Sequence, residues 1–426
     1  MKYYLFILGC QMNYADSERL AATLNKSGYQ PTDKEKEADL IIAVACSVRQ
    51  SAIERIWGKA ADWQKMKQKK PLITILTGCV LKTDKPKLYQ IFDYIFEIKD
   101  LTKLPIFLGS RGFTHSLPKA DYFKVHPAYQ NDFQAYVPIS TGCNNFCSYC
   151  VVPYVRGRET SRPARDIINE CKGLIKKGYK EITLLGQNVN SYGLDLKNKI
   201  KFPSLLKTIA NLPGNFWLRF VTSHPKDLSD DLIKVIAENK KICRYLHLPV
   251  QSGDNKILNK MNRKYTQKHY LNLIKKVREK IPALAITTDV IVGFPGETTR
   301  QFENTLKLFK VVKFDMAYIN KYSARAGTTA FKLKDNVTKN EKEKRYRKLN
   351  KILNRTALEK HKKLIDKTLK VLVEFKRKNY NYGKTETFKT VKFLTKKNLI
   401  GKFIVVKIVK AQAFGLEAKL IKKYGT

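Results

Sequence analysis

Short apolar runs alternate with helical stretches along most of this 426-residue chain, and this alternation constrains the fold more than any other feature. Parallel strands need a long crossover between them, so strands that alternate with helices indicate a parallel sheet. The first 125 residues predict strands at 3–8, 40–44 and 72–76, with helices at about 17–26 and 50–69. Asp16 or Ser17 is the expected cap of the first helix. The fold class is therefore α/β, beginning with an open parallel sheet.

A cysteine follows each of these three strands, namely Cys10, Cys46 and Cys79. The carboxyl ends of parallel strands share one edge, so we expect the three thiols to converge there. Gly9 and Gly78 allow the backbone to turn tightly beside a bound group. Three thiolates suit an iron–sulfur cluster with one iron left open, or a zinc ion with a fourth ligand elsewhere. Three buried structural cysteines are the plainer alternative.

The spacing CxxxCxxC occurs once, at Cys143, Cys147 and Cys150. Zinc motifs come as two pairs, and no second pair lies nearby. Three thiolates on one loop can hold three irons of a 4Fe-4S cluster and leave the fourth iron open to a small molecule. The spacing resembles that of radical S-adenosylmethionine enzymes, whose open iron binds S-adenosylmethionine. In that resemblance Tyr149 occupies the position that contacts adenine.

Six further apolar runs, at 135–139, 181–185, 217–222, 245–248, 285–292 and 314–319, alternate with helices. Six units instead of eight predict the open partial (β/α)6 barrel of the radical S-adenosylmethionine superfamily, with its chemistry at the carboxyl ends of the strands. An ordinary barrel enzyme would not explain the cysteine loop. The expected cofactor contacts are polar residues at these ends: Tyr149, Gln187, Asn188, Ser223, His247 and Gln251. No catalytic side chain is expected beyond the cysteines.

Several of these residues have a simpler interpretation. His247 is as compatible with a hydrogen-bonded core histidine as with a ligand contact. The turns at 251–253 and 293–297 contain glycines that serve backbone geometry alone. Cys171 lies within a helical pattern and Cys243 just before a strand, and both are expected to pack in the core.

The C-terminal segment is strongly basic. A charged helix is expected at 338–363, followed by short strands at 369–375, 390–393, 403–408 and 418–421. Residues 361–426 hold 18 Lys or Arg and 4 Asp or Glu, a net charge of +14. A small basic β-barrel with scattered aromatic residues resembles a TRAM domain, which binds RNA.

The whole chain carries 82 Lys or Arg against 37 Asp or Glu, a net charge of +45. Such a charge favours a polyanionic partner, although a lysine-rich genome also contributes to it. No apolar run approaches the roughly 20 residues that a membrane span needs. Eight cysteines spaced for ligation indicate a compartment where thiols stay reduced, so we expect a cytoplasmic protein.

All three segments resemble one family, the radical S-adenosylmethionine methylthiotransferases. The words that carry the resemblance are GCQMN at 9–13, NNFC at 144–147 and VVPYVRGRE at 151–159. Two local departures, Val44-Ala45 and the segment 326–329, leave the cysteines intact. The resemblance implies segments at 1–125, 129–361 and 364–426: a methylthiotransferase domain, a radical S-adenosylmethionine domain and a TRAM-like domain.

The resemblance also implies chemistry. Two 4Fe-4S clusters would be held, the auxiliary one by Cys10, Cys46 and Cys79 and the radical one by Cys143, Cys147 and Cys150. The implied reaction adds a methylthio group to carbon 2 of N6-isopentenyladenosine beside the tRNA anticodon. The implied partners are the anticodon arm, a flavodoxin- or ferredoxin-like electron donor and a sulfur donor of unspecified kind, with no membrane and a monomeric chain.

Two alternatives remain at this level. A sibling methylthiotransferase acts on N6-threonylcarbamoyladenosine in tRNA, and only the short words above separate the two. A non-enzymatic, zinc-bearing RNA-binding protein would use the same cysteines structurally.

Overall fold

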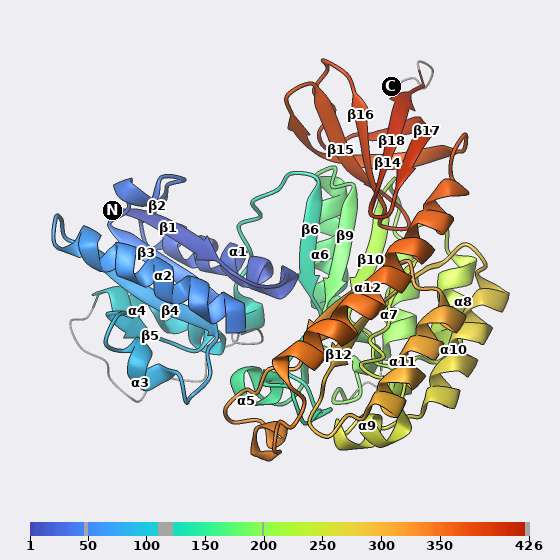
Figure 1. Cartoon of the computed structure of the whole chain (residues 1–426). Helices are drawn as coiled ribbons and strands as arrows, with labels where there is room; N and C mark the ends of the chain where they lie inside the picture. Colours follow the sequence, from blue (N-terminus) through green and yellow to red (C-terminus); the bar gives the residue numbers. More distant parts are fainter. Residues whose placement is uncertain (47–49, 110–121, 198–199, 422–426) are drawn as a thin grey trace.

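The computed structural model describes residues 1–46, 50–109, 122–197 and 200–421. Figure 1 shows three units in chain order: an N-terminal sheet with helices, a central partial barrel and a small C-terminal barrel. The α/β fold class is confirmed. Within those described ranges, no helix is long and apolar enough to cross a membrane.

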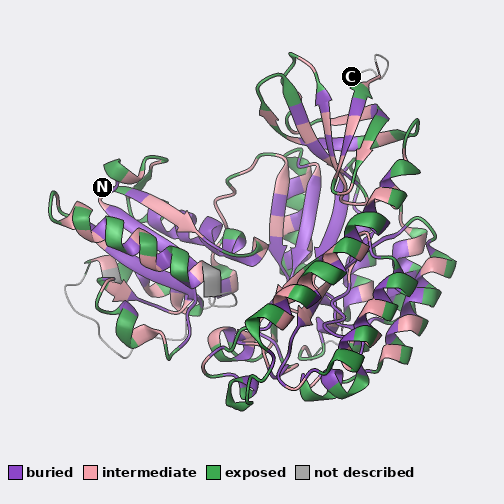
Figure 2. Ribbon diagram, in the orientation of Figure 1, coloured by how far each residue is buried: buried purple, intermediate pink, exposed green. Residues whose placement is uncertain are grey.

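The N-terminal unit is built on a parallel sheet in the order β2-β1-β3-β4-β5. Every residue of the central strand β3 is buried, because helices cover both faces of the sheet (Figure 2). Helix α1 packs on one face and helix α2 on the other. The elements are β1 Lys2–Ile7, α1 Gln11–Lys26, β2 Gln30–Pro31, β3 Leu40–Cys46, α2 Gln50–Lys67, β4 Ile73–Cys79, α3 Lys85–Leu88, β5 Tyr94–Ile95 and α4 Leu104–Gly109.

The predicted start of α1 is wrong. The helix begins at Gln11, and its N-cap residue is Cys10. Asp16 and Ser17 resemble capping residues in the sequence, but both lie inside the helix, where Ser17 Oγ donates a hydrogen bond to the carbonyl of Tyr14 at 2.7 Å. The earlier start places the first cysteine directly at the helix terminus.

The central unit has six parallel strands, as predicted. The sheets β6-β9-β10 and β11-β12-β13 are joined by a bridge between Leu218 and Ile242. Alternate residues of the strands face an outer layer of helices and form the largest core of the molecule. The strands are β6 Gln134–Pro138, β9 Glu181–Leu185, β10 Trp217–Val221, β11 Tyr245–His247, β12 Ala285–Val292 and β13 Met316–Lys321.

Helices α6 Ala164–Lys176, α7 Phe202–Ala210, α8 Asp230–Glu238, α10 Gln267–Lys280 and α11 Thr299–Val312 form the outer layer. The cysteine loop lies between β7 Ser140–Thr141 and α5 Val152–Arg156, and β7 pairs with β8 Thr160–Ser161. Helix α9 Asn255–Lys260 follows β11.

The inner face of the barrel receives helix α1 of the N-terminal unit. Met12 and Ala15 of α1 pack against Leu185, Tyr136 and Val221, which share the inner face of β6, β9 and β10. Figure 1 shows the end of α1 reaching β6. The N-terminal unit therefore lies against the open side of the barrel.

The C-terminal unit is a closed barrel in the order β14-β15-β16-β18-β17, preceded by helix α12 Lys339–Lys362. Strand β15 was not predicted, because Gly383 reads as an interruption. A Cβ at Gly383 would lie 2.2 Å from the carbonyl oxygen of Leu372, so this glycine permits close strand pairing instead of ending a strand. The strands are β14 Thr368–Arg377, β15 Tyr380–Thr385, β16 Thr390–Leu394, β17 Phe403–Gln412 and β18 Gly415–Leu420.

A buried arginine fixes this unit to the amino ends of the barrel strands. Arg219 pairs with Glu181 at 2.6 Å and donates hydrogen bonds to the carbonyls of Thr385 at 2.8 Å and Glu386 at 2.7 Å. Figure 1 shows the C-terminal barrel at one end of the strands and α5 at the other. The basic barrel and the cysteine loop thus occupy opposite ends of the central unit.

Candidate functional site

The three cysteines of the N-terminal unit converge at one edge of its sheet. Cys46 and Cys79 end neighbouring strands and are paired in register. Cys10 begins α1 beside them, and a Cβ at Gly9 would lie 2.8 Å from the Cβ of Cys46. Cys79 is close enough to the other two thiols to interact with them electrostatically.

The loops that carry these cysteines are tied together by Asn13. Its side-chain amide donates hydrogen bonds to the carbonyls of Leu8 at 2.6 Å and Ala45 at 2.8 Å. Gly78 has φ +91°, and a Cβ there would lie 2.6 Å from the carbonyl oxygen of Ala45. Only glycine fits this turn, so the backbone around the thiols is fixed before any metal binds.

Arg156, from the central unit, reaches into this first cysteine group. Its Nε donates a hydrogen bond to Cys79 Sγ at 3.0 Å, and its Nη2 donates to Asp16 at 2.6 Å and Asn13 at 3.1 Å. Asp16 also accepts a hydrogen bond from the hydroxyl of Tyr122 at 2.7 Å. The guanidinium compensates for part of the cost of burying a thiolate at Cys79.

Burial dominates the ionisation of Cys79 in the absence of metal. It raises the pKa of Cys79 to about 12, against the opposing effect of Arg156. A metal that binds thiolates has to displace that proton, so metal binding at this site releases protons.

The second cysteine group lies on the loop before α5. Cys143 and Cys147 are buried, and Cys150 is partly exposed. The backbone N–H of Cys150 donates to the carbonyl of Cys147 at 2.9 Å, which closes the turn. Cys143 Sγ accepts hydrogen bonds from the backbone and side-chain amides of Asn145, both at 3.5 Å. Burial raises the pKa of Cys150 to about 12.

Glycine is required at the start of this loop. Gly142 has φ +77°, and a Cβ there would lie 2.1 Å from the carbonyl oxygen of Arg158. At the other end, Ser148 Oγ donates to the carbonyl of Lys260 at 2.8 Å and its backbone N–H donates to Met261 at 3.0 Å. Both ends of the loop are therefore held by neighbouring backbone.

A second buried arginine contacts this group. Arg263 Nη1 donates to Cys147 Sγ at 3.4 Å, and its Nη2 donates to the carbonyl of Pro249 at 2.8 Å. Sequence reasoning missed Arg263 and Arg156 as site residues. Arg156 belongs to the motif VVPYVRGRE, which follows Cys150 directly, and this motif is the one sequence signal for its role. No local sequence pattern marks Arg263.

Next to this loop, a set of buried polar atoms has no hydrogen-bond partner within the described part of the chain. Such atoms cost about 1–3 kcal/mol each unless a ligand or water satisfies them. They follow the first three barrel strands and comprise Ser140 Oγ, Gln187 Oε1, Asn188 Oδ1, both amide atoms of Asn190 and Ser223 Oγ. Three of these residues, Gln187, Asn188 and Ser223, are predicted cofactor contacts.

Asn188 links these atoms to the cysteine loop. It lines a crevice of about 170 Å³ together with Asn144 and Asn145 of the loop. Its side-chain amide donates to Asp227 at 2.7 Å, which leaves its Oδ1 as the unsatisfied atom. Hydrogen-bonding groups without partners suit the amino, carboxylate and hydroxyl groups of S-adenosylmethionine.

Of the other predicted contacts, His247 has side-chain hydrogen bonds, whereas the contacts of Gln251 are made by its backbone and those of Tyr149 are apolar. His247 contacts Thr287 at 2.9 Å and Asp289 at 3.0 Å. The backbone N–H of Gln251 donates to the carbonyl of Asp289 at 2.8 Å. Tyr149 packs beside an apolar cluster of Ile257, Met261, Phe294, Tyr322 and Ala330. Cys171 and Cys243 are buried among apolar residues, away from both groups.

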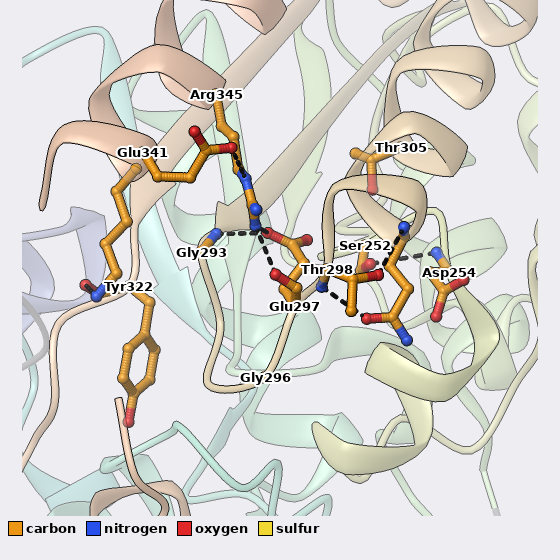
Figure 3. A network of polar contacts seen from close by, with 12 residues as sticks. Ser252, Asp254, Gly293, Gly296, Glu297, Thr298, Thr305, Tyr322, Glu341 and Arg345 are labelled. Atoms are coloured by element: carbon orange, nitrogen blue, oxygen red, sulfur yellow. Dashed lines mark hydrogen bonds and ion pairs between the residues drawn. The ribbon is translucent and has the colours of Figure 1, made fainter. Parts of the chain in front are cut away.

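The glycines in the turns at 251–253 and 293–297 shape the backbone, as predicted. Figure 3 shows Glu297 accepting hydrogen bonds from the backbone of Gly293 and from Arg345, both at 2.7 Å. A Cβ at Gly253 would lie 2.6 Å from the Cα of Thr305, so this turn packs directly on α11. These contacts fix the loops after β11 and β12.

Both cysteine groups fit iron–sulfur clusters in their donor chemistry. Each offers three thiols on glycine-shaped backbone with an arginine beside one sulfur. No group of three His, Cys, Asp or Glu side chains in the described ranges is arranged to hold a single metal ion. A 4Fe-4S cluster requires a different arrangement, because each of its thiolates binds a separate iron.

Family models and relatives agree with this arrangement. Residues 137–309 match the radical SAM superfamily, and residues 2–97 match the uncharacterized protein family UPF0004. A tRNA-2-methylthio-N(6)-dimethylallyladenosine synthase from Carboxydothermus hydrogenoformans is 43% identical, covering 98% of this chain and 99% of that protein. Its counterpart from Thermoanaerobacter pseudethanolicus is 44% identical, covering 99% of this chain and 93% of that protein.

Solved structures support the fold alone. The radical S-adenosylmethionine methyltransferase TsrM from Kitasatospora setae is similar with a TM-score of 0.58 and 15% identity, covering 78% of this chain and 77% of that one. The cobalamin-dependent radical enzyme OxsB is similar with a TM-score of 0.53 and 12% identity, covering 80% and 56%. A 4Fe-4S cluster and S-adenosylmethionine are the cofactors that radical SAM membership implies. Given full-length identity of 42–44% to these synthases, the chain belongs to the tRNA-2-methylthio-N(6)-dimethylallyladenosine synthase family of radical SAM proteins.

Proposed function

We propose that this protein adds a methylthio group to carbon 2 of N6-isopentenyladenosine in tRNA. The observation that carries the proposal is a direct contact between the segment that follows the second cysteine group and a thiol of the first. Helix α5 starts two residues after Cys150 and ends at Arg156, which is hydrogen-bonded to Cys79. A reaction that needs both a radical source and a sulfur source needs two such centres close together.

The central site provides the radical chemistry. Cys143, Cys147 and Cys150 would hold the radical cluster, and Gln187, Asn188 and Ser223 offer unsatisfied groups to S-adenosylmethionine. Tyr149, His247 and Gln251 remain proposed cofactor contacts. When bound, the two cofactors supply a radical that can remove the unactivated hydrogen on carbon 2.

The N-terminal site provides the second centre. Cys10, Cys46 and Cys79 would hold an auxiliary 4Fe-4S cluster, with Asn13, Gly9 and Gly78 fixing the backbone around it. Packing of α1 on the inner face of the barrel supports a single chamber that both sites face.

We propose that the remaining parts serve the RNA. The working units are 1–125, 129–361 and 364–426, and the last, with its net charge of +14 over residues 361–426, holds the anticodon arm. A flavodoxin- or ferredoxin-like donor supplies electrons, a separate donor renews the sulfur, and the protein acts as a cytoplasmic monomer.

Nucleoside mass spectrometry of total tRNA from cells with and without the gene tests the substrate. Loss of the methylthio mark on isopentenyladenosine, with the unmodified nucleoside accumulating, is the expected result. If only the threonylcarbamoyl nucleoside loses its mark, the sibling activity is the correct one. If both marks persist, the proposal is wrong.

Purified protein tests the two centres. Cys147→Ala should abolish S-adenosylmethionine cleavage and leave tRNA affinity intact, because the RNA surface lies elsewhere. Cys171→Ala, in the buried core of α6, is the matched control and should retain cleavage. Colourless protein that contains zinc and no acid-labile sulfide would favour the non-enzymatic alternative.

A further inference from the structure

A single guanidinium joins the two cysteine groups. Arg156 is the last residue of α5, and its side chain is only 2% exposed although it belongs to a short surface helix. It lies six residues beyond Cys150 in the chain and hydrogen-bonded to Cys79 in space. The contact links the loop of one group to a thiol of the other.

The positive charge of Arg156 forms an ion pair with the fully buried carboxylate of Asp16. Asp16, on α1, is 2.6 Å from Arg156 Nη2 and has no exposed surface. Tyr122 donates a hydrogen bond to its second oxygen at 2.7 Å, and Asn13 accepts one from Arg156 at 3.1 Å. Asp16 and Asn13, with Tyr122 supporting Asp16, therefore hold the guanidinium in one orientation, with its Nε directed at the sulfur of Cys79.

A hydrogen bond to a ligand sulfur and a nearby positive charge both stabilise the more negative, reduced state of an iron–sulfur cluster. The effect is large where water is excluded, because the low dielectric weakens screening. A buried carboxylate at the same place acts in the opposite direction.

We propose that Arg156 is a positioning residue that raises the reduction potential of the auxiliary cluster, and that Asp16 opposes it. The inference rests on the auxiliary cluster of the proposed function. Arg156 belongs to the segment that follows the cysteine loop of the radical cluster. The reduction potential of the auxiliary cluster therefore depends on the position of that loop.

The test is a redox titration of the full-length holoenzyme followed by electron paramagnetic resonance. Cys147→Ala removes a ligand of the radical cluster, so the signal that this variant retains identifies the auxiliary cluster. In Arg156→Gln the ratio of reduced to oxidised auxiliary cluster, at a fixed solution potential, should fall at least tenfold, which is about 59 mV for one electron. Asp16→Asn should shift the ratio in the opposite direction.

Arg158→Gln is the matched control. Arg158 is exposed, and its guanidinium lies 4.4 Å from the centre of the Phe146 ring. The variant loses the same charge two residues away from Arg156, so the reduction potential of its auxiliary cluster should equal that of the wild type. An equal shift in Arg158→Gln would show that bulk charge is responsible and would overturn the inference. So would unchanged potentials in both Arg156→Gln and Asp16→Asn with the cluster intact.

Two further outcomes are separable. If Arg156→Gln loses the cluster, Asp16→Asn decides alone: a rise in potential supports the inference and no change overturns it. If Cys10→Ala keeps the signal that Cys147→Ala also retains, the auxiliary cluster lies elsewhere, and the proposed function fails at that point independently of Arg156.

Discussion

Replacing Arg219 by methionine should destabilise the junction between the central and C-terminal barrels. The change leaves the Glu181 carboxylate, only 6% exposed, with the side-chain amide of Gln134 at 3.2 Å as its remaining donor. Breaking a buried ion pair from one side costs about 3–5 kcal/mol, because an uncompensated charge stays in the interior. The carbonyl of Glu386 loses the hydrogen bond from Arg219 as well, and the carbonyl of Thr385 keeps the one from the backbone N–H of Phe388 at 3.0 Å.

The double variant Arg219→Met/Glu181→Met separates the two contributions. It removes the unpaired charge, so only the two carbonyl contacts, at about 1.5–3 kcal/mol each, should remain lost, and the double variant should be more stable than the single one. Urea unfolding of the metal-free protein can be followed by tryptophan fluorescence. Trp217, which packs on Phe403 at 4.7 Å across the same junction, contributes to this signal together with Trp57 and Trp63 of α2.

Arg347→Met is the control, because Arg347 pairs with Glu343 on the surface with 77% of its side chain exposed. Its effect should stay below about 0.5 kcal/mol. The reasoning is refuted if the single and double variants are equally destabilised, since the buried charge would then contribute nothing.

Three other outcomes are expected. Gly142→Ala should lose the iron of the radical loop, measured by iron analysis, whereas Gly173→Ala in α6, where an added Cβ meets nothing within 4 Å, should keep it. Ser223→Ala should weaken S-adenosylmethionine binding, measured by calorimetry, without lowering the melting temperature, because the Ser223 hydroxyl has no partner within the described ranges. Thr288→Val is the control. It removes a hydroxyl that is hydrogen-bonded to the backbone of Val250 and Leu248, so it should lower the melting temperature. Burial raises the pKa of Glu18 from 4.5 to about 7, so the native state keeps a proton that the unfolded chain releases, and stability falls as pH rises through this window. Glu18→Gln should therefore raise the melting temperature more at pH 8 than at pH 5, and equal gains at both would contradict this origin.

The sequence predicts the strands of the barrel and the placement of the cysteines well. Strands buried on both faces are continuous apolar runs, and each run ends where the polar residues begin. The convergence of Cys10, Cys46 and Cys79 follows from the common edge of parallel strands. These features depend on local pattern and on one topological rule, and both are visible in a single sequence.

Contacts between the three units cannot be predicted from a local pattern in the sequence. Arg156 and Arg263 reach sulfur atoms across the fold, and no periodicity marks an arginine that will be buried. The start of α1 was misplaced because Asp16 resembles a cap, whereas its carboxylate pairs with Arg156. Strand β15 was missed because Gly383 resembles a break, whereas it allows two strands to approach closely.

The packing of Met12 and Ala15 against Leu185 bears on how such a chain can evolve or be divided. A partial barrel has an unclosed side, and here another unit supplies part of the missing wall. Removing the N-terminal unit would leave Tyr136, Leu185 and Val221 facing water as an apolar strip. The N-terminal and central units are therefore not interchangeable modules, because each covers apolar surface of the other. We expect the two units to be inherited together, to be expressed together and to unfold together.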